Sequence, residues 1–140
     1  MSAQQILPRM GTVDTLNGLL ATLYILQREK TESENVGFTP LTICNTLYTL
    51  RNDSRYHEAL KYIDFRRCGE NSYSSTLERY FFSGEVWGFF RRQGRFGELL
   101  YITEKESQRT LHELQEKHGE EVLFLHELAL AFLDYMPGSS

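Results

Sequence analysis

The residues with the clearest chemical potential in this sequence are arginines gathered around a glycine-bearing turn. Arg91 and Arg92 precede Gln93-Gly94, and Arg95 follows it. Guanidinium groups in this pattern can reach the phosphate backbone of a duplex or enter a narrow minor groove. The same arginines would also keep an exposed strand edge soluble, so both interpretations stay open.

A second set of polar residues lies just before this turn, on a segment whose apolar spacing predicts a helix from about Ser74 to Ser83. Ser74 and Ser75 fall at its start, where free backbone N–H groups and the helix dipole favour a phosphate. The alternative is that these serines only cap the helix.

Catalytic and metal-binding patterns are incomplete. His112-Glu113 begins a stretch similar to the HExxH zinc motif, but Glu116 stands where the second histidine is needed. Cys44 and Cys68 lack metal-ligand spacing, and we expect them to be buried or unreactive thiols. We therefore expect no catalytic residue, no metal and no cofactor, and a protein that is not an enzyme.

Composition and charge describe one globular domain over residues 1–140. The chain is 41% hydrophobic and 24% charged, with a net charge of −4. The balance is −1 over residues 1–50, +3 over 51–95 and −6 over 96–140. A basic middle beside an acidic end is compatible with one nucleic-acid face, and equally with a solvated surface.

No stretch reads as a signal peptide or a membrane span, so we expect a cytoplasmic protein without membrane contact. Residues 1–12 and 137–140 are expected to be flexible.

The order of elements begins with helices. Leucines at helical spacing predict a helix from Val13 to about Arg28. Thr39-Pro40 marks the start of a second helix through Arg51. Ser54 is expected to cap a third helix from Arg55 to about Phe65, and residues 66–72 to form a turn. The fourth helix, from about Ser74 to Ser83, is expected to end at Gly84.

The segment from Val86 to Ile102 changes character and predicts a hairpin, because it holds two runs of strand-forming residues around a glycine-bearing connection. Thr103 and Glu106 then form a capping box that starts a long helix ending at Gly119. A last helix spans about Glu120 to Met136. The expected fold is mainly α, with about six helices and a two-stranded wing.

Three short motifs within residues 39–110 support a more specific interpretation. They are Tyr73-Ser74-Ser75-x-Leu77, then Gly84-x-Val86, then Leu100-Tyr101-Ile102-Thr103-Glu104-Lys105. This pattern resembles PadR-like regulators and the prokaryotic winged-helix domains related to Panacea-type antitoxins. The chain departs from it at Glu70-Asn71-Ser72, before the Tyr-Ser pair where those families often have Gly-Pro, and at Glu106, where they have glycine.

The resemblance implies a winged helix-turn-helix, whose recognition helix is the one before the hairpin. It also implies that Ser74, Ser75, Glu78 and Arg79 face outward on that helix. On this interpretation Ser74, Ser75, Arg79, Arg91, Arg92 and Arg95 bind double-stranded DNA, and the protein is a transcriptional regulator.

The last helix is apolar around most of its circumference, which predicts burial on two sides. The second side is expected to be another subunit, as PadR-like dimerisation through C-terminal helices also implies. The interface residues would be Leu125, Leu128, Phe132, Leu133 and Met136. A central core helix in a monomer is the alternative.

A different class of function also fits the sequence. The acidic end and the apolar last helix favour a protein-interaction module, similar to antitoxin-like or phage-encoded proteins that bind and neutralise a protein partner.

Overall fold

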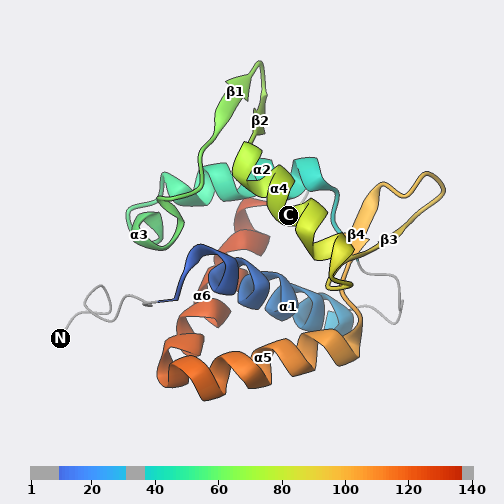
Figure 1. The fold of residues 1–140 in the computed structure, drawn as a ribbon. Coiled ribbons are helices and arrows are strands. Elements are labelled where there is room, and N and C mark those ends of the chain that lie inside the picture. The colour runs from blue at the N-terminus through green and yellow to red at the C-terminus, as the bar shows by residue number, and fades with distance from the viewer. Residues whose placement is uncertain (1–9, 31–36, 137–140) are drawn as a thin grey trace.

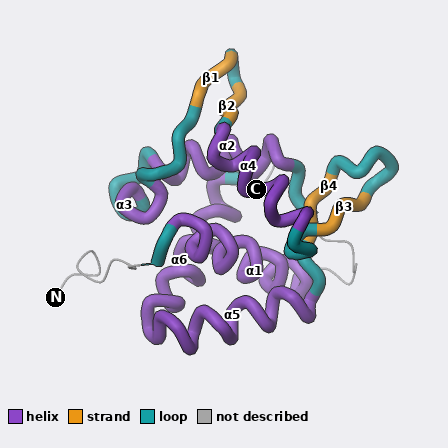
Figure 2. The backbone as a smooth tube through the Cα atoms, viewed as in Figure 1, coloured by secondary structure: helices purple, strands orange, loops and turns teal. Residues whose placement is uncertain are grey.

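A computed structural model describes residues 10–30 and 37–136, which form a mainly helical fold with two antiparallel hairpins (Figures 1 and 2). The longer helices are α1 (Thr12–Lys30), α2 (Pro40–Arg51), α4 (Ser75–Val86), α5 (Glu104–His118) and α6 (Val122–Tyr135). Helix α3 (His57–Leu60) is one turn, and η2 (Gly119–Glu121) is a 3-10 turn. The hairpins are β1 (Arg66–Cys68) with β2 (Asn71–Tyr73), and β3 (Arg91–Gln93) with β4 (Leu99–Tyr101). The expected class, mainly α with a small hairpin, is confirmed.

Helix α1 is the centre of the packing, with α5 and α6 against it (Figure 1). The predicted leucine stripe of α1 is buried, as Leu16, Leu19 and Leu23 show. Gly18 permits close contact with α6, because a Cβ atom at this position would lie 2.3 Å from Cδ1 of Leu125. The core therefore depends on the absence of a side chain at one point of its central helix.

Two helix starts are confirmed in atomic detail. The Thr39 hydroxyl accepts a hydrogen bond from the Thr42 backbone N–H at 3.1 Å, and Pro40 begins α2. The Thr103 hydroxyl accepts from the Glu106 N–H at 3.2 Å at the start of α5. These caps satisfy backbone donors that have no partner inside the helix.

The predicted third helix, Arg55 to Phe65, is wrong in length and in its cap. Neither Ser54 nor any other side chain caps it, since Tyr56 directly precedes its first residue. The Asp53 carboxylate accepts from the Arg55 backbone N–H at 2.9 Å in the turn before the helix. Helical structure lasts only from His57 to Leu60, since the chain must turn toward β1.

The segment expected to be a turn, residues 66–72, is mostly the first hairpin, with Arg67 opposite Ser72. Helix α2 holds it in place through Asn45, whose Oδ1 accepts from the Ser72 N–H at 2.6 Å. Its Nδ2 donates to Asn71 Oδ1 at 3.1 Å. The guanidinium of Arg67 donates to the Ser72 hydroxyl at 2.9 Å.

The predicted end of the fourth helix and the predicted start of the wing are also wrong. Helix α4 continues through Gly84 to Val86, and the strands begin at Arg91. Gly84 serves close packing instead, because a Cβ there would lie 2.3 Å from Cδ2 of the buried Phe90 ring. The hairpin connection itself, between residues 93 and 99, lies where the sequence places it.

One isolated bridge ties the hairpin to the segment before α2. The Phe38 N–H donates to the Leu100 carbonyl at 2.9 Å, and the Leu100 N–H donates to the Phe38 carbonyl at 2.8 Å. The second hairpin therefore has a third backbone segment beside β4.

The predicted flexibility of residues 1–12 and 137–140 falls largely outside the described residues. Met10 lies inside them, and its side chain is buried with Leu114 and Leu125. Within the described ranges, none of the helices has both the length and the apolar composition needed to cross a membrane.

Candidate interaction surface

Helix α4 is held with one side fixed against the core. The Ser74 hydroxyl caps it by accepting from the Leu77 N–H at 3.1 Å. The Tyr80 hydroxyl donates to Asn17 Oδ1 of α1 at 2.6 Å, and burial raises the pKa of Tyr80 well above its ordinary value. The opposite side, which includes Ser75 and Arg79, faces solvent.

An acidic side chain occupies the start of α4, where the DNA-binding interpretation would place a phosphate. Asp64 Oδ1 accepts from the Thr76 backbone N–H at 3.1 Å and also from the Thr76 hydroxyl. These hydrogen bonds lower the pKa of Asp64, so its charge persists at neutral pH. Ser74 is buried and acts as the helix cap, which is the alternative interpretation of the two serines. A phosphate at this helix end would meet a carboxylate.

The second hairpin is attached to α4 through Arg92. Its guanidinium pairs with the Glu85 carboxylate of α4, with Nη2 lying 3.2 Å from Oε2, and Nη1 donates to the Gly97 carbonyl at 3.0 Å. Of the three predicted wing arginines, Arg92 therefore has a structural role.

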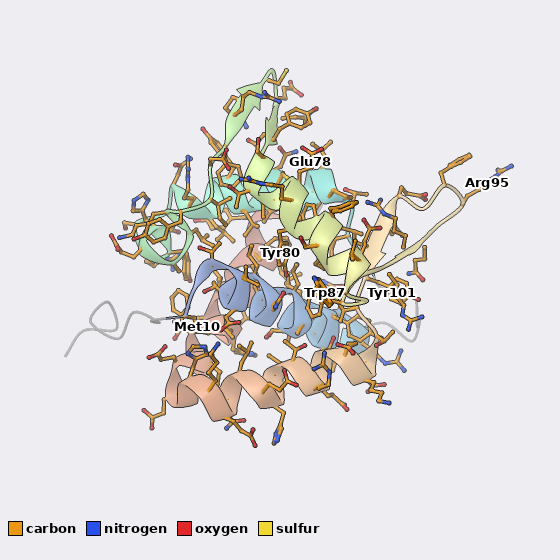
Figure 3. The ribbon with its side chains drawn as sticks, in the orientation of Figure 1. Met10, Glu78, Tyr80, Trp87, Arg95 and Tyr101 are labelled. Carbon is orange, nitrogen blue, oxygen red and sulfur yellow. The ribbon has the colours of Figure 1, made fainter. Side chains whose placement is uncertain are left out.

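The other predicted arginines are exposed, on different elements. Arg79 lies on α4, Arg91 on β3, and Arg95 at the outer end of the hairpin, pointing away from the helices (Figure 3). The Arg95 guanidinium lies 5.7 Å from the Phe96 ring centre. Arg79 and Arg92 line one groove of about 570 Å³ together with Glu78 and Glu85, so charge there is mixed.

Exposed apolar side chains gather on the same elements. Phe82 on α4 is 68% exposed, Val86 at its end 65%, Trp87 just beyond it 86%, and Phe96 on the hairpin 86%. These four residues are called the aromatic surface below. The sequence allows two placements for Phe82 and Phe96, in the core or wing packing or exposed, and the structure places both in solvent. For Phe82, spacing alone does not predict exposure, because it directly follows the buried Tyr80 and Phe81 on α4.

The first hairpin adds two further arginines near α4, and sequence analysis interpreted their segment only as a turn. Arg66 is exposed, while the guanidinium of Arg67 lies 4.8 Å from the ring centre of Tyr48. The signal that could have located this hairpin is the Gly69-Glu70 pair between two short runs, because glycine allows the positive φ of a tight connection.

The predicted dimer residues lie on α6, and most of them are covered by this chain. Leu125, Leu128, Phe132 and Leu133 are buried, and Met136 is half-buried. Helices α1 and α2 take the second side of α6 that was assigned to a partner subunit. This is the core-helix alternative. The large apolar side chains that α6 leaves exposed are Leu123, Leu130 and Tyr135.

The residues considered for catalysis are dispersed. His112 Nε2 lies 3.1 Å from Glu116 Oε1 on the exposed face of α5. Cys44 is buried, which raises the pKa of its thiol to about 11, and Cys68 is exposed on β1. In the part of the chain that the structure describes, no three His, Cys, Asp or Glu side chains gather as a metal site would require.

Comparison of this chain with protein families, with curated proteins and with solved structures found no match.

Proposed function

We propose that this chain is a non-enzymatic protein-binding module that contacts its partner through the aromatic surface. The supporting observation is the exposure of Phe82, Trp87 and Phe96, at 68%, 86% and 86%, on adjoining elements. Large aromatic side chains supply most of the binding free energy at protein interfaces, and Trp is among the most enriched residues there. Phe82 and Trp87 each line a groove beside α4, so both lie at hollows that a partner's side chains could enter.

The charges around α4 favour a protein over a nucleic acid. Asp64 occupies the helix start, Glu78 lies on the exposed side, and Glu85 neutralises Arg92. A helix that entered a major groove in this arrangement would bring carboxylates toward phosphates. A protein partner with its own apolar patch meets no such repulsion.

The architecture we propose for this module is a winged helix. Helix α4 directly precedes the β3–β4 hairpin, α5 follows it, and Phe38 adds a third backbone segment beside β4. In a winged helix the element before the wing presents the contact surface. Here that element carries Phe82, and Trp87 directly follows its last residue.

A photo-crosslinking residue placed at position 82 or 96 tests this function in cells of the source organism. We expect a defined covalent adduct with one protein from both positions, because both side chains would lie in the interface. His112, which is exposed on α5, provides the matched control position and should give no such adduct. The same adducts from all three positions, or none from 82 and 96, would contradict the proposal.

DNA binding is the second candidate, favoured by the exposed arginines Arg79, Arg91 and Arg95. On this proposal the chain is a cytoplasmic transcriptional regulator that binds duplexes as a homodimer.

Replacement of Arg91 and Arg95 by alanine tests the DNA candidate. We expect weaker binding to any duplex in fluorescence anisotropy, and a log–log salt slope smaller by about 2, since each lost phosphate contact removes about 0.9. The matched control is Arg109→Ala, which removes an exposed arginine on α5. The candidate fails when the intact protein binds no duplex at low salt.

A further inference from the structure

A groove of about 500 Å³ runs between the start of α1 and the second half of α4. Its base is formed by the buried Leu16 and Tyr80 and the half-buried Phe89. Figure 3 shows Tyr80 on the side of α4 that faces α1, and Trp87 near the end of α4. The groove therefore lies at one edge of the aromatic surface and shares Trp87 with it.

The rim of this groove consists of apolar side chains that the chain leaves in solvent. Val13 is 59% exposed, Tyr62 73% and Trp87 86%. They come from α1, from the turn after α3, and from the end of α4. A base of apolar side chains with exposed aromatic groups at its edges is a shape into which one large apolar side chain fits, with the rim closing around it.

Among the described residues that line the groove, Arg79 is the single charged one. The other polar groups there are neutral, namely Thr12, Asn17, Thr76 and Ser83. Arg79 is exposed and makes no ion pair with another described residue, whereas Arg92 on the other side of α4 is paired with Glu85. The groove therefore combines an apolar base with one arginine that has no ion-pair partner among the described residues, and its complement is an apolar group with a carboxylate.

From this combination we infer that the groove binds a short segment of a protein partner that carries a large apolar side chain and a neighbouring carboxylate. The apolar side chain would lie between Val13, Tyr62 and Trp87, and the carboxylate would pair with Arg79. This inference rests on the proposed protein-binding function and names the chemistry of the partner.

A displayed library of random short peptides, selected on the intact protein, tests the inference. We expect the enriched sequences to combine an aromatic or large aliphatic residue with Asp or Glu. A synthetic peptide with the enriched sequence should then bind the intact protein in solution.

Two groove variants locate the binding site. Arg79→Glu should weaken binding of that peptide at least about tenfold, since a hydrogen-bonded charge pair becomes a repulsion. Trp87→Ala should weaken it by a similar factor. Phe96→Ser is the matched control, because it removes an aromatic group outside the groove. All three side chains are exposed, so these variants should keep the wild-type circular dichroism spectrum.

Several results would overturn the inference without affecting the proposed function. They are enriched peptides that lack a carboxylate, binding that survives Arg79→Glu, or binding lost only in Phe96→Ser. A concentration-dependent dimer that Trp87→Ala dissociates would make the occupant a second copy of this chain and would also overturn it. Failure of the library to enrich any peptide would overturn the inference as well. The crosslinks from positions 82 and 96 test the proposed function separately.

Discussion

Asp53 joins two distant parts of the chain through one carboxylate. The Arg55 guanidinium donates to it from Nε at 3.2 Å and from Nη2 at 2.8 Å. The Tyr135 hydroxyl at the end of α6 donates to Oδ2 at 2.9 Å. These hydrogen bonds, with that of Arg55 the largest, hold the pKa of Asp53 far below its ordinary value of 3.8. A turn after α2 is thereby fastened to the last helix.

Asp53→Asn should lower the free energy of unfolding at pH 7, because the charged acceptor is lost. A carboxyl group whose pKa is lower in the folded state stabilises the fold above its unfolded pKa and loses that contribution as the pH falls. The difference between variant and wild type should therefore shrink as the pH falls below 3.8. Urea denaturation across that range checks this, and a difference independent of pH would contradict it.

Among single residues, the roles that the sequence predicts correctly are those that depend on local interactions. Thr39 and Thr103 were identified as caps because a cap and its N–H partner are three positions apart. The partners of Asp64 and Arg92 were not predictable in the same way. Asp64 meets Thr76, and Arg92 meets Glu85, only after the chain has folded.

Gly84 shows how an element boundary was misplaced. A glycine after a short apolar helix is a common stop signal, yet α4 continues past it. The reason is tertiary, since the Phe90 ring lies against the backbone at this position. The start of the wing was placed at Val86 for the same reason. The spacing of apolar residues does not show that the Phe90 ring packs against the Gly84 backbone, so it does not show that the helix continues to Val86.

Gly84→Ala should therefore destabilise the protein, although alanine favours helices by about 1 kcal/mol over glycine. Overpacking against the buried Phe90 ring costs about 1–3 kcal/mol, which exceeds that gain. Gly11→Ala is the control, because a Cβ atom there meets nothing within 4 Å. Chemical denaturation gives both values, and a stabilised Gly84→Ala protein would show that the ring moves aside without cost.

For the whole molecule, the last helix has two interpretations: an interface with another subunit, or a core helix packed within one chain. Its composition correctly indicated burial on two sides, but composition cannot tell whether the second side meets the same chain. Helix α6 contacts both α1 and α2, so the chain itself supplies both sides. The order of the longer helices and the connection of the second hairpin were predictable, whereas the first hairpin and the location of the exposed aromatic groups were not.

Leu128→Ala should lower the free energy of unfolding by about 2–5 kcal/mol, since Leu128 is 0% exposed within one chain. Leu123→Ala on the same helix should change it by less than about 0.5 kcal/mol, because Leu123 is 68% exposed. Denaturation at several protein concentrations checks this. A loss for Leu128→Ala that varies with concentration would instead indicate an interface between subunits.

The bridge between Phe38 and Leu100 has a consequence for the order of folding. Its two hydrogen bonds join positions far apart in the chain. They close a long chain loop that contains α2, the first hairpin and α4. Closing so long a loop carries an entropic cost that local helices do not have. The β3–β4 hairpin should therefore pack against the helices late in folding and detach from them early in unfolding. In a hydrogen-exchange experiment its backbone amides should exchange with solvent faster than those of α1.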